Sequence, residues 1–236
     1  MNNQPDEKLY EETPYGNSTY KLRDRQNEKK YPTEINYQYK QKTFERWFQN
    51  GVVKRDNDEP SYTVYTYNDI SRDNTPHCID KMWMIGDKIT RNNDNPARIL
   101  YYGDDKKERE FWMINGKYHR DNGLPADIYY DKNGIKRREI WMKNNKKYRG
   151  STQELKNPAS WIEYHEDGKI ACLKWYKNNK LHRRNGFAII YCNENSDSHG
   201  ENHINGNYQS TVRIEDIRQN NDYIAHVEAG INRDRR

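Results

Sequence analysis

Tryptophan, lysine and histidine recur together at fixed spacing, and this combination could bind an anion or an aromatic base. The residues concerned are Trp112, Lys117, His119, Trp141, Lys146, Trp175, Lys180 and His182. An exposed indole can stack on a base while a lysine pairs with a phosphate, or the row could hold a loop of a partner protein. Alternatively, the tryptophans pack between successive units, and the histidines are their cross-strand partners rather than acid–base groups.

An arginine follows five of the six tryptophans by eight residues. These arginines are Arg55, Arg91, Arg120, Arg149 and Arg183, and Arg23 follows Tyr15 in the same way. A guanidinium could bind an anionic ligand, but its return in every unit favours a structural role. We expect each arginine stem to pack on aromatic rings while the guanidinium binds carbonyls or an acidic residue of a neighbouring unit.

Motifs that build catalytic or metal centres are absent from the sequence. There is no phosphate-cradling glycine loop, no H-E-x-x-H and no G-x-S-x-G. His199 and His203 are four residues apart, but the intervening glycine and asparagine make a poor helix for metal ligands. The three cysteines form no spaced pair and are typical of reduced intracellular thiols. We therefore expect a non-enzymatic protein without a cofactor or a metal.

The elements that position these residues form an internal repeat. The anchors Trp47, Trp83, Trp112, Trp141 and Trp175 are separated by 36, 29, 29 and 34 residues, and a weaker copy begins at Tyr15. A turn pair such as Asn115-Gly116 follows each tryptophan, as a two-residue hairpin requires. A proline then opens a run of alternating residues, for example Pro125, Ala126, Ile128 and Tyr130. These features predict about six stacked β-hairpin units in an elongated antiparallel sheet.

The hairpin register predicts two different faces. Trp112 faces His119 across the hairpin, so the tryptophans share one face with the nearby lysines. The other face carries Met82, Phe111, Met113 and Ile140, together with the repeated arginines. Because this second face is more apolar, we expect it to be the buried side.

Composition limits the class of protein. Only 32% of the 236 residues are hydrophobic, which favours a thin sheet with an aromatic core over one thick core. The charge of +5 comes from well-mixed signs and is too small for a dedicated nucleic-acid binder. No signal peptide and no apolar run of roughly 20 residues is present, so we expect an intracellular, cytoplasmic protein with no membrane span.

The chain divides into four predicted segments. Residues 1–13 are expected to be a flexible N-terminus, and residues 14–193 hold the hairpin repeats. Residues 194–209 are polar and are predicted to be a linker. Residues 210–236 are predicted to form a short C-terminal helix with Ser210 or Thr211 as N-cap, which caps the open end of the array or docks on a partner.

Two segments carry a resemblance to a known family. WMINGKYHRDNGLPADIYY and WYKNNKLHRRNGFAIIYC resemble the MORN-like hairpin repeats, with the pattern W-x-x-N-G-K-x-H-R-x-x-G-P-A, found in proteins of large DNA viruses and bacteriophages. The same repeats are distantly similar to those of a bacterial antitoxin-like family. Thr90 and Tyr148 replace the histidine of the pattern. The resemblance implies an all-β, MORN-like solenoid that serves as a scaffold, and it implies no activity.

We therefore expect a non-enzymatic scaffold for protein–protein assembly, as a viral structural or host-interaction protein. Its expected partners are other proteins, including virion components or copies of itself, in host cytoplasm or the virion. One alternative is a module that binds single-stranded nucleic acid or anionic lipid weakly through the tryptophan and lysine face. Another is an antitoxin-like inhibitor of a partner enzyme.

Overall fold

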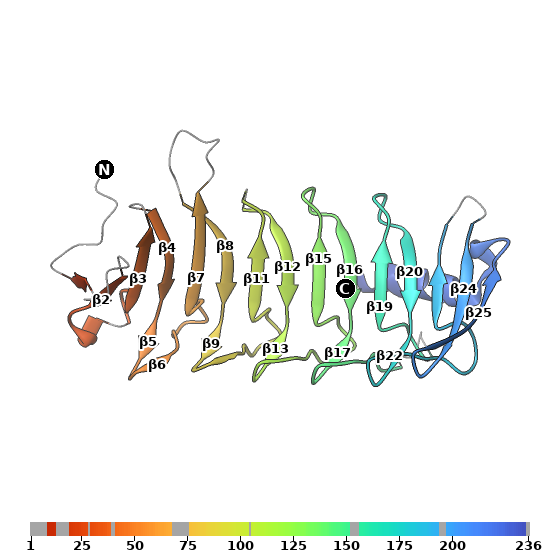
Figure 1. Ribbon diagram of the computed structural model, residues 1–236, viewed down its shortest axis with the longest axis horizontal. Coiled ribbons are helices and arrows are strands. Elements are labelled where there is room, and N and C mark those ends of the chain that lie inside the picture. The colour runs from red at the N-terminus through yellow and green to blue at the C-terminus, as the bar shows by residue number, and fades with distance from the viewer. Residues whose placement is uncertain are drawn as a thin grey trace. The chain divides into compact units, whose positions relative to one another are not determined.

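The computed structural model describes residues 9–12, 19–27, 29–38, 41–67, 76–103, 105–151, 156–193 and 197–234. The chain divides into two compact units, residues 1–117 (unit 1) and residues 118–236 (unit 2). Each unit is built from antiparallel strands joined by hairpins, and within each unit the short hairpins lie at one end of the long strands (Figure 1). The predicted all-β class, with an antiparallel sheet of hairpins and a C-terminal helix, is confirmed.

Unit 1 contains one antiparallel sheet whose strands pair in chain order. The long strands are β1 (Tyr10–Glu12), β2 (Thr19–Leu22), β3 (Glu34–Gln38), β4 (Gln41–Arg46), β7 (Tyr62–Tyr67), β8 (Pro76–Met82), β11 (Arg98–Tyr101) and β12 (Lys107–Phe111). The short hairpins are β5 (Phe48–Gln49) with β6 (Val52–Val53), and β9 (Met84–Ile85) with β10 (Lys88–Ile89). β13 (Met113–Ile114) and β14 (Lys117–Tyr118) follow at the unit boundary, and a 3-10 turn, η1, covers Arg25–Asn27.

Unit 2 repeats this arrangement and adds helical elements. Its long strands are β15 (Asp127–Tyr130), β16 (Lys136–Ile140), β19 (Trp161–Tyr164), β20 (Ile170–Lys174), β23 (Ile189–Tyr191), β24 (His199–Ile204) and β25 (Asn207–Arg213). The short hairpins are β17 (Met142–Lys143) with β18 (Lys146–Lys147), and β21 (Tyr176–Lys177) with β22 (Lys180–Leu181). The 3-10 turn η2 (Ile217–Gln219) leads into α1 (Asn221–Asp234).

The turn pairs have the backbone that the short hairpins require. Both central residues have positive φ in four of the short hairpins: Asn50 and Gly51, Asn115 and Gly116, Asn144 and Asn145, and Asn178 and Asn179. This is the pattern of a type I′ turn, which asparagine and glycine tolerate best. In the hairpin of Gly86-Asp87 only Gly86 has positive φ, at 63°, as a type II′ turn would have. The predicted turns are therefore present.

Small residues mark the start of the long strands. Ala97, Ala126, Ala159 and Ala188 each have no exposed surface. The backbone N–H of Trp83 donates to the carbonyl of Ala97 at 2.9 Å, and that of Trp175 donates to Ala188 at 2.8 Å. A larger side chain at these positions would have to displace neighbouring groups in a close-packed interior.

The apolar core lies on one face of each sheet. In unit 2, the cross-strand row Ile162, Leu173 and Ile190 is buried, and η2 and α1 pack against it. Figure 1 shows α1 lying along that sheet. In unit 1, a smaller cluster contains Tyr10, Tyr20, Leu22, Ile35 and Tyr37. Tyr20 and Tyr37 meet edge to face with centroids 5.7 Å apart, so aromatic rings supply much of this buried surface.

The prediction of a polar linker over residues 194–209 is wrong for its second half. His199–Ile204 and Asn207–Arg213 form β24 and β25, joined by a turn at Asn205-Gly206 with positive φ. This hairpin is one more repeat, because Ile-Asn-Gly-Asn-Tyr at 204–208 matches Ile-Asn-Gly-Lys-Tyr at 114–118. It has Asn202 and Ser210 where the other units have tryptophan and arginine, so the anchor spacing did not reveal it.

The C-terminal helix begins eleven residues later than position 210. Its N-cap is Asn220, whose side-chain oxygen accepts the backbone N–H groups of Asp222 and Tyr223 at 3.1 and 3.2 Å. Ser210 and Thr211 belong instead to β25. The helix contacts β20 on the core face, so its described side chains cover a face of the sheet.

Part of the predicted flexible N-terminus is ordered. Tyr10–Glu12 form β1, which pairs with β2, and the hydroxyl of the buried Tyr10 donates to the carbonyl of Pro32 at 2.9 Å. Residues 1–8 and 13, and the anchor Tyr15 of the weak first copy, lie outside the described residues.

Gly200 tests the packing of the last hairpin. A methyl group added here would overlap the ring of Phe187, so we expect Gly200→Ala to lower the free energy of unfolding by about 2 kcal/mol in urea titrations. In a Phe187→Ala background the same substitution should cost much less. Gly150→Ala is the matched control, because its nearest atom is the Tyr148 hydroxyl at 3.8 Å. An equal cost in both backgrounds would contradict the overlap.

Candidate functional site

Four of the repeated arginines stack on the tryptophan of their own repeat. The guanidinium carbon lies 3.9 Å from the ring centroid for Arg55 and Trp47, 3.8 Å for Arg91 and Trp83, 3.9 Å for Arg149 and Trp141, and 4.1 Å for Arg183 and Trp175. These distances are short enough for a cation–π interaction. The arginines were expected on the methionine side of the hairpins, and this expectation is wrong, because they lie over the tryptophan rings.

The polar ends of this pair are held by backbone carbonyls. The indole N–H donates to a carbonyl 18 residues earlier, from Trp112 to Asp94 at 3.0 Å, from Trp141 to Gly123 at 2.7 Å and from Trp175 to Asn157 at 2.9 Å. Arg91, Arg120 and Arg183 each donate from Nη1 to the carbonyl of Pro96, Pro125 and Phe187, at 3.0, 3.2 and 3.2 Å. The pair therefore connects its own hairpin with two other segments, one holding the carbonyl bound by the indole and one holding the carbonyl bound by the arginine. In Trp47 the buried indole N–H has no partner among the described residues.

Arg91 and Arg183 also donate hydrogen bonds to both oxygens of a carboxylate. Arg91 donates to both oxygens of Asp58 at 2.6 and 2.8 Å, and this hydrogen bonding holds the pKa of Asp58 below its ordinary value. Arg183 donates to both oxygens of Asp222, at the start of α1, at 2.8 Å each. Bidentate pairs of this kind are strong and directional. The carbonyls and carboxylates are the contacts expected of a structural arginine.

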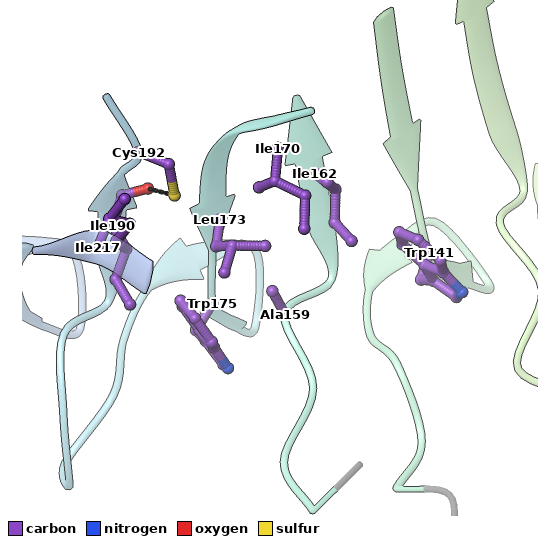
Figure 2. Packing of buried hydrophobic residues seen from close by; sticks show 9 residues of the cluster. All are labelled: Trp141, Ala159, Ile162, Ile170, Leu173, Trp175, Ile190, Cys192 and Ile217. Carbon is purple, nitrogen blue, oxygen red and sulfur yellow. Dashed lines mark hydrogen bonds between the residues drawn. The ribbon is translucent and has the colours of Figure 1, made fainter. Parts of the chain in front are cut away.

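The tryptophans and lysines that were predicted to form one row lie at different depths. Trp112, Trp141 and Trp175 are buried, with at most 7% of their surface exposed. Lys117, Lys146 and Lys180 are exposed beside the turns. Figure 2 shows Trp141 and Trp175 within the cluster that contains Ala159 and Ile162. The face predicted to be exposed thus supplies core residues. The face predicted to be buried is buried at Phe111, Met113 and Ile140 and only half-buried at Met82, Met84 and Met142.

The histidine position links one hairpin to the next. In unit 2, His182 Nδ1 accepts the backbone N–H of Asn205 in the following turn at 3.0 Å, and His119 Nδ1 lies 3.0 Å from the side-chain oxygen of Asn144. In unit 1, Thr90 Oγ1 accepts the N–H of Asn115 at 3.2 Å. Threonine can replace histidine because this position needs a side chain that bonds the neighbouring turn.

Sequence reasoning missed a series of three glutamates, of which Glu110 and Glu139 are buried and Glu45 is half-buried. Glu45, Glu110 and Glu139 each stand two residues before a tryptophan, and Glu139 is only 1% exposed. A lysine three residues earlier binds each of them, at 3.0 Å for Lys42 and Glu45, 2.7 Å for Lys107 and Glu110, and 3.1 Å for Lys136 and Glu139. The hydroxyls of Tyr65 and Tyr164 donate to Glu45 and Glu139 at 2.5 Å. The available signal was the glutamate at a constant offset from tryptophan.

Helix α1 docks on the last tryptophan and arginine pair through His226. The Ala159 N–H donates to His226 Nε2 at 2.9 Å, and His226 Nδ1 donates to the carbonyl of Asp222 at 2.6 Å. The ring meets Trp175 edge to face with centroids 5.6 Å apart. Burial lowers the pKa of His226 to about 4, and the nearby Arg149 and Arg183 act in the same direction. The helix is therefore held by a neutral histidine.

A basic groove lies between the β17–β18 and β21–β22 hairpins of unit 2. It encloses about 710 Å³ and carries seven cationic side chains, with no aspartate or glutamate among its described lining residues. Its lysines are Lys143, Lys146, Lys147 and Lys177, and its arginines are Arg149, Arg183 and Arg184. Tyr148, at the groove, is 57% exposed. This basic concavity is a candidate site for an anion.

Other chemistry-bearing residues do not assemble into a centre. The described residues contain no group of three or more histidine, cysteine or acidic side chains able to hold a metal. His199 and His203 lie on strand β24, where four residues span about 13 Å, and His203 is bound to Glu201 at 2.8 Å. Burial raises the pKa of the Cys172 thiol to about 12, which disfavours its reactive thiolate.

Comparison with known proteins finds neither a family model that matches the chain nor a similar curated protein. The MORN-like resemblance therefore stays a prediction. No helix in the described part of the chain combines the length and apolar character needed to cross a membrane.

The tryptophan and arginine pair can be tested by a double-mutant cycle. We expect Arg91→Gln to lower the free energy of unfolding by about 2 kcal/mol, because it removes the stack on Trp83 and the bonds to Asp58. Combined with Trp83→Leu, the two costs should fall short of their sum by about 1 kcal/mol in urea titrations. The control pair, Arg91→Gln with Trp175→Leu, joins residues of different repeats. Additive costs for Arg91 and Trp83 would rule out the coupling.

His226 predicts a pH dependence of stability. In the unfolded chain a histidine takes up a proton near pH 6.5, whereas the folded protein keeps His226 neutral down to about pH 4. The unfolded state thus binds more protons in this window, and stability falls by about 3 kcal/mol as the pH drops from 6.5 to 4. Urea titrations of the protein and of His226→Gln across this window should show a fall in stability that is steeper by about this amount where His226 is present.

Proposed function

We propose that the protein is a non-enzymatic repeat scaffold that binds another protein through the short hairpins of unit 1. In this proposal the repeated tryptophans and arginines build the fold, and the tips of the hairpins carry recognition. The assembly to which it belongs would be a particle or a complex, and a viral structural or host-interaction role is one setting that fits.

An exposed aliphatic row carries this proposal. Val52, Ile85 and Ile114 belong to three successive hairpins of unit 1 and are 45%, 54% and 40% exposed. A Cβ placed on Gly86, the residue that follows Ile85, would lie 3.9 Å from Cγ1 of Val52, so the turn beside Ile85 adjoins Val52 of the preceding hairpin. Exposed aliphatic side chains that gather in one place are typical of a protein interface, whereas isolated ones need no explanation.

Lysines flank the aliphatic row. Lys88 pairs with Ile85 across its hairpin and is exposed, as is Lys117. An apolar centre with a charged rim is the usual anatomy of a protein interface. We therefore expect a partner segment that offers apolar side chains bordered by carboxylates. This segment can belong to a different protein and does not have to come from a second copy of the chain.

The repeated polar side chains support a structural rather than a catalytic use. The indole and guanidinium groups form hydrogen bonds with carbonyls and carboxylates of the same compact unit, either unit 1 or unit 2, as described above. The antitoxin-like alternative stays a prediction, and it requires a specific target enzyme to copurify in constant ratio.

We expect Ile85→Asp combined with Ile114→Asp to lower recovery of the partner at least about tenfold, because the charges oppose burial of the row. The measurement is quantitative mass spectrometry of lysine cross-links made in the native source, with links expected at Lys88 and Lys117. Ile135→Asp with Ile224→Asp is the matched control, since both residues are exposed isoleucines of unit 2. Equal recovery with both pairs, at unchanged thermal stability, would exclude this row as the interface.

A further inference from the structure

The basic groove of unit 2 holds cations that the fold does not use. Arg149 and Arg183 stack on tryptophans, and Lys143 lies 3.6 Å from Asp121. Lys146, Lys177 and Arg184 are exposed, and in the described part of the chain no carboxylate pairs with them. Three uncompensated cations around one concavity create a positive potential that favours an oligoanion.

Tyr148 brings an unoccupied aromatic ring to the same groove. At the equivalent position Thr90 and His182 bond the next turn through their side chains. Here that connection is made without Tyr148, because Asn179 accepts the Lys147 N–H at 2.8 Å and donates to the Asn145 carbonyl at 3.0 Å. The tyrosine is therefore not required for the hairpin contact, and more than half of its surface faces solvent.

We propose that this groove binds a short stretch of single-stranded nucleic acid. Lys146, Lys177 and Arg184 would pair with successive phosphates, and a base would stack on Tyr148. The residues differ from the tryptophan and lysine face expected from the sequence, because the indoles are buried. Charge alone would equally suit an acidic peptide, but the exposed ring beside the cations favours a ligand that carries bases.

The size of the groove limits the length of the contact. Its volume of about 710 Å³ lies within the range of small-ligand sites, so only a few nucleotides would be held. With three phosphate contacts, the logarithm of the binding constant should fall with the logarithm of salt concentration with a slope of about −2. Binding would accordingly be modest in affinity and sensitive to salt.

The test measures fluorescence anisotropy of a labelled single-stranded oligonucleotide of about twelve nucleotides with the full chain. We expect Lys146→Glu with Lys177→Glu to weaken binding at least about tenfold and to make the salt slope shallower. The matched control is Lys88→Glu with Lys117→Glu, which makes the same charge change on hairpins of unit 1. Equal weakening by both pairs would overturn the proposal, since net charge and not the groove would then set the affinity.

The stacking contact is tested separately. Tyr148→Ala should weaken binding of the oligonucleotide about fivefold or more and leave binding of an abasic oligomer of equal length unchanged. Tyr208→Ala is the control, because Tyr208 is 58% exposed on β25 and outside the groove. Equal affinity of the protein for the abasic oligomer, or for polyglutamate of the same length, would overturn the proposal. Binding to phosphatidylserine vesicles without binding to the oligonucleotide would do the same.

Discussion

The stack of an arginine on a tryptophan is the interaction on which the structure depends. Each pair places a large ring at the point where a long strand gives way to a short hairpin, and both polar ends reach carbonyls of other segments. A buried indole N–H or guanidinium without such partners would destabilise the protein. Because the indoles of Trp112, Trp141 and Trp175 have these bonds, a chain with few aliphatic residues can still build an ordered interior from aromatic and cationic side chains.

Repetition leaves the tips of the hairpins free to differ. The position two residues after the tryptophan is isoleucine at 85 and 114 and lysine at 143 and 177, although the pairs beneath are alike. Unit 1 thus presents an aliphatic row, whereas unit 2 presents a basic groove. The core sets the fold, and the tips set the chemistry of the surface. A single architecture can in this way carry two kinds of recognition on different repeats.

The hairpins could be predicted from sequence because their determinants are local. Asn-Gly and Asn-Asn pairs demand positive φ, and the offset from tryptophan to arginine counts the units. The depth of the tryptophans could not be predicted, because alternation between faces does not carry across the break in the strand where each of them lies.

The last repeat was missed because Asn202 and Ser210 replace both anchors. The start of the helix was misplaced because Ser210 and Thr211 are acceptable caps in isolation, and only the pairing of β25 with β24 decides against them. The basic groove could not be predicted, because it is formed by two hairpins whose anchor tryptophans lie 34 residues apart in the sequence.

The number of residues between hydrogen-bonded partners sets the order in which parts of the chain can assemble. The indoles of Trp112 and Trp175 each contact a carbonyl of the preceding repeat only 18 residues away, so loop-closure costs are small and folding can begin at any pair of neighbouring repeats. His226 is different, because it meets Ala159 across 67 residues. During synthesis from the N-terminus, the repeats can be complete before this contact forms. Helix α1 then docks last, on a surface that the folded repeats of unit 2 already form.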